Sequence, residues 1–184
     1  MPLDIGVGLL LGILLSSLSG LNYELCLVVG LLASLLPDID FIWQYIRTRR
    51  VPDTNHRDGL HYPLLFVPIV GTLGWYMRPY IGLIFALGAF IHFMHDSIGV
   101  GFGIKWLFPF KNNSYLFLYQ TGLPTNKDMP RKIMQSWNDD ERRRAVKKYR
   151  DPHWIKHIYF QVHPYGIFEY LILIVGVAAA INHH

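Results

Sequence analysis

Residues 25–40, LCLVVGLLASLLPDID, join an apolar run to two acids. The run Leu25–Leu36 holds no charged residue, and Pro37 ends it. A run of this kind is typical of a membrane helix or of a helix buried in a bundle. Asp38 and Asp40 follow at once, and carboxylates in such a place are costly unless they are solvated, paired or bound to a metal. The stretch therefore predicts an apolar helix with a polar site at its end.

Four more apolar segments lie outside this stretch. Hydrophobic residues make up 52% of the 184-residue chain and charged residues only 16%, whereas a typical soluble domain has roughly 25% charged residues. Several segments fall short of the roughly 20 residues that span a bilayer, although local thinning accommodates short helices. We expect an all-α, polytopic membrane helical bundle that forms one membrane-embedded domain over residues 1–184. A soluble helical bundle, or partly inserted hairpins, is the alternative. The five apolar helices are expected at Ile5–Leu18, Leu25–Leu36, Pro63–Met77, Tyr80–Phe93 and Tyr165–Ile181.

The basic residues are divided unevenly between the two ends of these expected helices. If the turns near Asn22 and Arg78 lie on one side of a membrane, Arg78 is the only one of the 17 Lys and Arg residues on that side. The other 16 lie on the opposite side, which the positive-inside rule makes cytoplasmic. We therefore expect five crossings, with the N-terminus inside and the C-terminus outside.

Residues 99–164 form a long basic cytoplasmic loop in this topology. Lys105–Leu123 is rich in Phe, Tyr and Leu, and a turn with short strands is one interpretation of it. Ser136–Tyr149 is expected to be a helix, with Ser136 as its N-cap, acids first and bases last. This helix is either solvated or a basic surface that lies against anionic lipid headgroups. Because the positive charge gathers in this loop, it does not indicate nucleic-acid binding.

Metal-ligand residues stand at the end of the second apolar segment and before the third. The spacing of Asp38 and Asp40 lets both carboxylates turn toward one ion, whereas helix capping would need only one of them. Residues 56–61, HRDGLH, contain a glycine that permits a sharp turn, so the imidazoles of His56 and His61 can converge. Neutral imidazole is a common ligand for zinc and related metals.

A third motif, HFMHD at residues 92–96, ends the fourth segment. His92 and Asp96 are four residues apart, so they share one helical face. His95 is a candidate ligand, outer partner or proton carrier. Glu169, which begins the last segment, is a ligand, a general base, or an acid that favours the positive end of a helix dipole. Because the topology brings the motifs to one face of the membrane, we expect a shared metal site. Its expected ligands are Asp38, Asp40, His56, His61, His92 and Asp96.

These motifs resemble those of the inner-membrane metal-dependent hydrolase family, the YdjM-like proteins. Residues 35–40, LLPDID, resemble the family's LLPDxDH motif, residues 56–61 resemble HRGxTHS, and residues 92–96 resemble HxxxD. The chain departs from these motifs at Phe41, where His is usual, and at Leu60, where Thr is usual. The family is distantly similar to zinc phospholipase C and nuclease P1, all-helical enzymes whose clustered His and Asp hold zinc for phosphoester hydrolysis. The resemblance implies an inner-membrane location, a divalent metal and hydrolysis.

The resulting hypothesis is a membrane-bound metal-dependent hydrolase that acts on a phosphoester at the cytoplasmic membrane surface, such as a phospholipid or another amphipathic substrate. The expected ligands exceed those of one tetrahedral zinc, which favours two ions, or one ion with additional outer partners. Glu169 or His95 is the expected general base, and Arg57 is expected to hold a phosphate or a carboxylate. One alternative is a non-catalytic membrane protein whose metal joins the helix ends. Another is a metal or proton transporter, which would need polar residues at the centres of the segments, and these centres have almost none.

Overall fold

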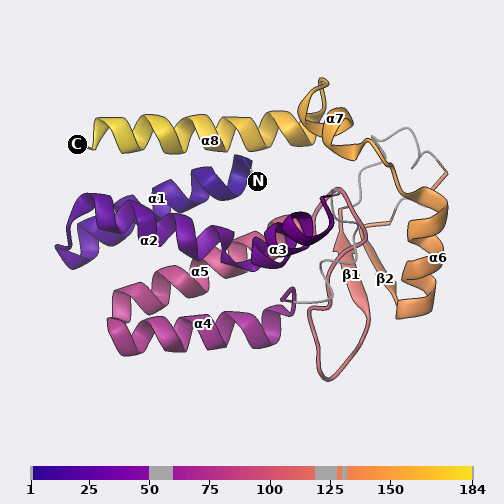
Figure 1. The fold of residues 1–184 in the computed structure, drawn as a ribbon, viewed down its shortest axis with the longest axis horizontal. Coiled ribbons are helices and arrows are strands. Elements are labelled where there is room, and N and C mark those ends of the chain that lie inside the picture. The colour runs from indigo at the N-terminus through magenta and orange to yellow at the C-terminus, as the bar shows by residue number, and fades with distance from the viewer. Residues whose placement is uncertain (1, 50–59, 119–127, 130–131, 184) are drawn as a thin grey trace.

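Helices dominate the protein, whose structure is a computed structural model that describes residues 2–49, 60–118, 128–129 and 132–183. Five longer helices run side by side, and the shorter elements gather at one end of them (Figure 1). The described elements are α1 (Pro2–Ser19), α2 (Tyr23–Leu35), the short 3-10 turn η1 (Leu36–Asp38), α3 (Ile39–Thr48), α4 (Pro63–Met77), α5 (Pro79–Asp96), β1 (Ser114–Phe117), β2 (Met134–Trp137), α6 (Asp139–Tyr149), α7 (Trp154–Tyr159) and α8 (Pro164–Asn182).

The long helices begin where the local sequence favours a helix start. Proline stands at the first turn of α4, α5 and α8, where its missing N–H group leaves no intrahelical hydrogen bond unmade. The side chain of Asn22 caps α2 by accepting a hydrogen bond from the backbone N–H of Leu25, at 3.0 Å. These starts are short-range features, and they explain why the apolar runs form helices at the expected places.

Glycine lets the helix backbones approach closely. A Cβ atom added to Gly30 of α2 would lie 2.2 Å from the carbonyl oxygen of Gly8 in α1, and one added to Gly6 would lie 2.5 Å from the carbonyl oxygen of Ile172 in α8. Small residues at such contacts are typical of helix packing in membranes. α1 is thereby held between α2 and α8, and its first turn lies next to α5 as well. The buried centre of the bundle contains Leu11, Leu15, Cys26, Ala33, Ile81 and Ile84.

Among the described residues, three helical stretches are long and apolar enough to cross a membrane: 2–19, 23–48 and 164–182. α4 is apolar but shorter. α5 has the length of α1, but its last turn carries His92, His95 and Asp96. The predicted helical membrane bundle is thus supported with three candidate spans and not clearly with five.

Residues 99–164 contain more regular structure than a loop, because β1, β2, α6 and α7 all lie in this region. β1 pairs with β2 in an antiparallel sheet, with Ser114 opposite Trp137 and Phe117 opposite Met134. The predicted helical fold is thus confirmed for most of the described residues, but an all-α chain does not include this small sheet. The sequence pattern did not establish the sheet, because the pairing joins segments about twenty residues apart, and only one of them lies within the stretch that suggested short strands.

The start of α6 also differs from the prediction. Ser136 belongs to β2, where it pairs with Tyr115, so its backbone is extended and it does not cap the helix. The N-cap is Asn138, whose side chain accepts a hydrogen bond from the N–H of Glu141 at 2.9 Å. The Glu141 carboxylate accepts one from the N–H of Asn138 at 3.0 Å, which completes a capping box.

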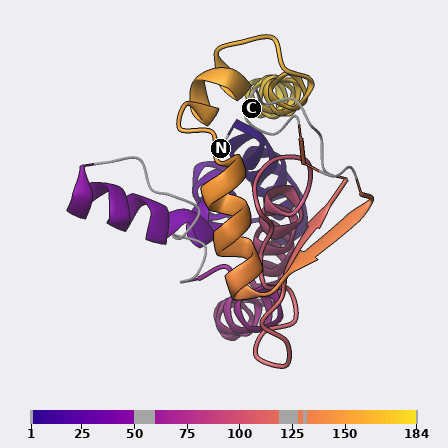
Figure 2. The same ribbon diagram turned by 90° about the vertical axis from the view of Figure 1, so that its right-hand side faces the viewer.

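The axis of α3 is not parallel to the long helices of the bundle (Figure 2). The turn η1, which contains Pro37, separates it from α2. Figure 2 looks along the bundle, so that α4 and α8 are seen end-on while α3 extends to the side. The stretch 23–48 is therefore one candidate span by length and composition, but its last third turns across the other helices.

Candidate metal centre

The two acids of the opening stretch lie at the bend between α2 and α3. Pro37 cannot continue the hydrogen-bond ladder of α2, and the chain tightens into the 3-10 turn that ends at Asp38. Asp38 is buried there, with 8% of its surface exposed. Asp40 is the second residue of α3. The bend thus brings two carboxylates, two residues apart, to the same turn of the chain.

Two histidines lie against Asp38. His61, fully buried, comes just before Pro63 opens α4, and His92 is buried in the last part of α5. The Nε2 atom of His61 lies 3.8 Å from Oδ1 of Asp38, and Nε2 of His92 lies 3.6 Å from the same oxygen. One ligand atom from each of these three residues lies within 4.8 Å of the other two.

Asp96 completes this cluster from the last turn of α5. Its Oδ2 atom lies 3.2 Å from Nε2 of His61 and 3.8 Å from Nε2 of His92. The four side chains come from the end of α2, the chain before α4 and the end of α5. We call Asp38, His61, His92 and Asp96 the inner cluster.

The inner cluster fits a divalent metal ion. A tetrahedral zinc ion bonded at about 2.0–2.1 Å separates its ligand atoms by roughly 3.3 Å, close to the distances between these atoms. The Nε2 atom of His92 is buried and accepts no hydrogen bond from the described residues, so its lone pair is available to a ligand. Two imidazoles and carboxylates are donors that zinc prefers.

In both imidazoles Nε2 faces the inner cluster and Nδ1 is the outer nitrogen. Each outer nitrogen lies against a carboxylate or a carbonyl oxygen. Nδ1 of His61 lies 3.2 Å from Oδ2 of Asp40, which also accepts a hydrogen bond from the N–H of Leu60. Nδ1 of His92 lies 3.0 Å from Oδ1 of Asp4 and 3.0 Å from the carbonyl oxygen of Ser34. Such partners favour the tautomer whose Nε2 lone pair faces the inner cluster, and they orient the ring.

The charge around His61 has a clear effect on its pKa. Burial alone disfavours the imidazolium and lowers the pKa, but the carboxylates of Asp38, Asp40 and Asp96 outweigh burial and raise it well above the ordinary value. In the absence of a metal, these three carboxylates therefore favour the protonated, positively charged form of the His61 ring.

A second buried network continues from Asp4. Oδ1 of Asp4 lies 3.5 Å from Nδ1 of His95, and Nε2 of His95 lies 3.1 Å from Oε1 of Glu169. Glu169, fully buried, also accepts a hydrogen bond from the hydroxyl of Tyr159 at 2.9 Å. Burial and the neighbouring carboxylate raise the pKa of Tyr159, so the hydroxyl stays a donor. The network joins α1, α5, α7 and α8 behind the ring of His92.

The structure places the predicted residues in three ways. Four of them form the inner cluster. Asp40 lies at the outer nitrogen of His61, while His95 and Glu169 lie in the network behind His92. His56 and Arg57 lie outside the described residues.

Sequence reasoning missed Asp4 and Tyr159. Asp4 had a usable signal, because it is an acid in the first turn of an apolar helix, the same situation that singled out Asp38 and Asp40. It is 1% exposed and contacts two histidines of α5. Tyr159 had no such signal, since a tyrosine in an aromatic-rich, basic region is unremarkable.

A basic cavity lies near the same end of the molecule. Its volume is about 810 Å³, and α6, which forms one wall, lies beyond the end of the bundle where α2 and α5 finish (Figure 1). Nζ of Lys105 lies 2.7 Å from Oδ1 of Asp139 at the cavity wall. The cavity is lined by Lys105, Asp139, Arg142, Arg143, Val146, Lys147, Arg150 and Pro152. Cations thus outnumber acids there, which suits an anionic ligand.

Comparison with known proteins identifies the family. The family model described as YdjM inner membrane protein matches residues 4–180, which include Asp4, the inner cluster and Glu169. No curated protein and no solved structure matches the chain. The match supports the inner-membrane location that the apolar helices and the motifs predicted. Because it extends over nearly the whole sequence, the chain belongs to the YdjM inner membrane protein family.

Proposed function

We propose that this protein is a membrane-bound, metal-dependent hydrolase that acts on a phosphoester of an amphipathic substrate at the membrane surface. The observation that carries the proposal is the inner cluster, in which two imidazoles and two carboxylates converge while the outer nitrogens are already held. In hydrolysis, water adds to phosphorus and the alcohol leaves. A bound divalent ion, zinc by its donor set, supplies the Lewis acidity for this reaction.

Asp38, His61 and His92 would hold the ion, because their ligand atoms lie closest together as a set. Two histidines with one carboxylate are a set found in catalytic zinc sites, which keep one position open. Asp96 borders both imidazoles and would accept a proton from an incoming water. One ion suffices for these residues, and a second would require ligands beyond the inner cluster.

His95, Glu169 and Asp4 would act through His92 as positioning residues. Their contacts run from the outer nitrogen of His92 into the protein, and Glu169 is fully buried. The network keeps the His92 ring fixed and places negative charge behind it, which strengthens the ring as a ligand.

The substrate's phosphate needs cations as well as a metal. The basic cavity beside α6 offers Arg143 and Lys147, in addition to the sequence-predicted Arg57. A lipid-like substrate would keep its tails in the bilayer while its headgroup enters this end of the bundle. We propose the cytoplasmic side of a five-crossing topology for the site, because 16 of the 17 Lys and Arg residues belong to the segments that the sequence assigns to that side.

The alternative is a structural metal that locks three helix ends together, with no catalysis. This reading is favoured if Asp96 is the fourth ligand, because four protein ligands close a tetrahedral site.

Metal analysis of the purified protein and of three variants tests both readings. We expect His92→Ala to lose the metal, while the control His153→Ala keeps it. Asp96→Asn separates the readings: a catalytic site retains metal and loses phosphoester hydrolysis, whereas a structural site loses metal and stability together. Full metal content in His92→Ala would overturn the metal centre, and a wild-type protein that is loaded with metal but inactive on phosphomonoesters, phosphodiesters and phospholipids would overturn the hydrolase.

A further inference from the structure

α3 carries an apolar face that no other part of the described protein covers. Ile39, Ile42, Trp43 and Ile46 follow the i, i+3, i+4, i+7 spacing and therefore share one side of the helix. Their exposed fractions are 50%, 49%, 68% and 55%, and α3 contains no buried residue. The other sides carry the polar residues Asp40, Gln44 and Thr48, together with the aromatic residues Phe41 and Tyr45. A soluble protein seldom leaves such a face in water.

The direction of α3 differs from that of every long helix. In Figure 2 the bundle is viewed end-on, whereas α3 lies across the view and extends to the side of the bundle. If the bundle stands upright in the bilayer, α3 therefore runs sideways from the bundle and not along the other helices through the membrane. The bend at η1 changes the direction of the chain between α2 and α3, and the same bend brings Asp38 into the inner cluster.

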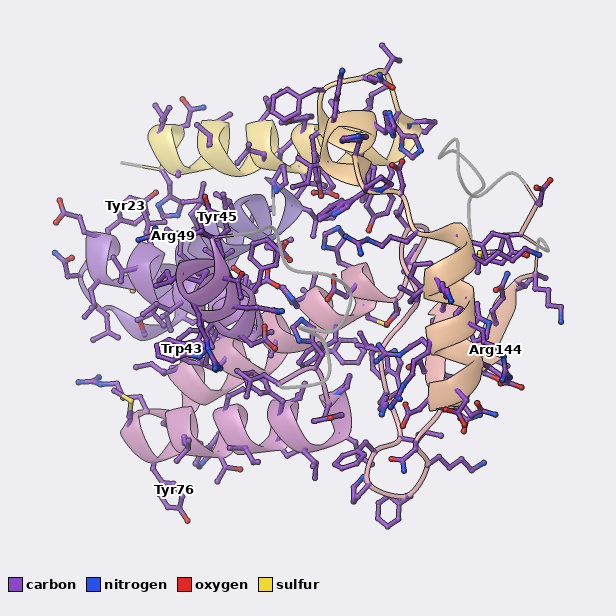
Figure 3. All side chains as sticks on the ribbon, turned by 45° about the vertical axis from the view of Figure 1, so that its right-hand side comes forward. Tyr23, Trp43, Tyr45, Arg49, Tyr76 and Arg144 are labelled. Atoms are coloured by element: carbon purple, nitrogen blue, oxygen red, sulfur yellow. The ribbon has the colours of Figure 1, made fainter. Side chains whose placement is uncertain are left out.

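The level of α3 along the bundle corresponds to a membrane boundary. α3 lies at the end where α4 and α8 begin, and Tyr76 lies at the far end (Figures 1 and 3). The 19 residues of α8 rise by roughly 28 Å between these ends, close to the thickness of the hydrocarbon core. Exposed Trp75, Tyr76 and Tyr80 mark the far boundary, where interfacial aromatic residues are common.

The exposed surface of α2 leads directly to α3. Leu25, Val28 and Leu32 are each about half exposed on α2, a candidate span, and the apolar face of α3 follows after the bend. Arg47 and Arg49 are exposed at the end of α3, where they suit anionic headgroups. Figure 3 shows Trp43 on the opposite side of α3 from Tyr45 and Arg49, so the side of Trp43 is separate from the one that carries Arg49.

From these observations we infer that α3 is an interfacial helix, which lies in the boundary between headgroups and acyl chains with Ile39, Ile42, Trp43 and Ile46 in the lipid. Amphipathic helices with Trp on one face and bases on the other bind membranes in this way. The occupant of the face is the inner membrane itself. The inference does not depend on hydrolysis or on a bound metal.

The position of α3 also affects the inner cluster, because a residue of α3 contacts one of its histidines. Asp40 of α3 contacts Nδ1 of His61 and the N–H of Leu60. The interfacial helix α3 therefore carries the carboxylate that orients His61. A substrate that lies in the same lipid layer would reach the cluster without leaving the membrane surface.

Site-directed spin labelling of the full-length protein in phosphatidylethanolamine–phosphatidylglycerol vesicles tests the inference. Labels replace single residues in Trp43→Cys, Ile46→Cys, Gln44→Cys and Thr48→Cys, and the buried Cys26 serves as the unlabelled background. The measured quantity is the ratio of collisions with oxygen, which enters lipid, to collisions with a water-soluble nickel chelate. Leu73→Cys on exposed α4 provides the lipid reference, and Val162→Cys, where the side chain is 93% exposed, provides the water reference.

We expect positions 43 and 46 to resemble Leu73, and positions 44 and 48 to shift toward Val162. Equal, water-like ratios at all four positions would overturn the inference. Exclusion of both reagents at positions 43 and 46 would also overturn it, because a second copy or another protein would then cover the face.

A second measurement avoids labels. Brominated lipids quench tryptophan fluorescence on contact, and we expect the quenched fraction to fall in Trp43→Phe relative to the wild-type protein. An unchanged quenched fraction would contradict a lipid position for Trp43. Both measurements are repeated on metal-free protein, so that failure of the metal proposal and failure of this inference are distinguishable.

Discussion

At the scale of single residues, the acids around the two histidines determine what the centre can do. Asp40 and Asp4 hold the outer nitrogens of His61 and His92, and Asp38 and Asp96 face the inner nitrogens. Carboxylates in these two positions have different tasks, because the outer ones orient a ring and the inner ones can bind an ion. Substitutions at the two positions should therefore have different effects.

Asp4→Asn tests an outer position. The change removes the negative charge behind His92 and His95 while it keeps the shape of the side chain, so we expect zinc affinity to fall by about 10–100-fold. Competition with a chromophoric chelator measures this affinity. Glu24→Gln, an exposed acid at the far end of the bundle, is the matched control and should bind zinc like the wild-type protein. An Asp4→Asn variant with wild-type affinity would show that the ring needs no charged partner.

The raised pKa of His61 predicts a pH dependence for the metal-free protein. Because the folded-state pKa lies above the unfolded value of about 6.5, the protonated ring stabilises the fold fully below that value. This stabilisation is lost as the pH rises through the folded-state pKa. We expect the thermal midpoint of metal-free protein to fall over this range, and His61→Gln to lack that slope. Thermal unfolding in the presence of a chelator, followed across pH, measures it; a midpoint that rises in the wild-type protein would contradict the prediction.

At the scale of elements, the residues that end or begin the helices determine where the ligands of the site lie. Pro37 ends α2 and creates the bend, and Pro63 starts α4 just after His61. α6 shows how a similar signal can be assigned to the wrong residue. Both Ser136 and Asn138 are capping residue types three positions before an acid, and only the pairing of β2 with β1 excludes the first.

Asn138→Ala tests the observed cap of α6. Loss of its hydrogen bond to the N–H of Glu141 should cost about 1 kcal/mol of helix stability. Hydrogen exchange of the α6 amides measures this loss locally. Ser136→Ala is the matched control, since the exposed Ser136 side chain lies in a strand, and it should leave the exchange nearly unchanged. The reverse order of effects would restore Ser136 as the cap.

At the scale of the whole molecule, close helix packing brings the functional side chains together. α1 contacts α2 and α8 through glycines, and this contact carries Asp4 at its end to His92 and His95. The centre thus depends on a packing surface that contains none of its ligands.

Gly30→Ala tests this dependence. The new Cβ would meet the backbones of Gly8 and Gly12, at 2.2 Å from the carbonyl oxygen of Gly8 and 2.5 Å from the N of Gly12, so α1 and α2 must separate. We expect a loss of about 1–3 kcal/mol, the usual cost of overpacking, together with weaker metal binding. Thermal unfolding in detergent and zinc titration measure both. Val28→Ala on the exposed side of α2 is the control and should change neither strongly; a stable Gly30→Ala variant would mean that the contact is looser than the structure indicates.

The sequence by itself determined the apolar helices, the proline stops and the ligand motifs, because each depends on residues that lie close together along the chain. It predicted the acids at the end of α2 and the pair His92 and Asp96 for that reason. The helix spacing alone places this pair on one face. The family match over residues 4–180 agrees with those motifs.

Only the tertiary structure decided which ligands converge and which stand behind them. Asp40 and Asp38 are two residues apart, yet the bend at η1 directs them to opposite nitrogens of His61. Asp4 reaches His92, 88 positions later, only because α1 packs beside α5. The direction of α3 and the pairing of β1 with β2 are likewise set by contacts between distant segments. Local pattern fixes the conformation of a segment, but the free energy of packing decides where its side chains meet.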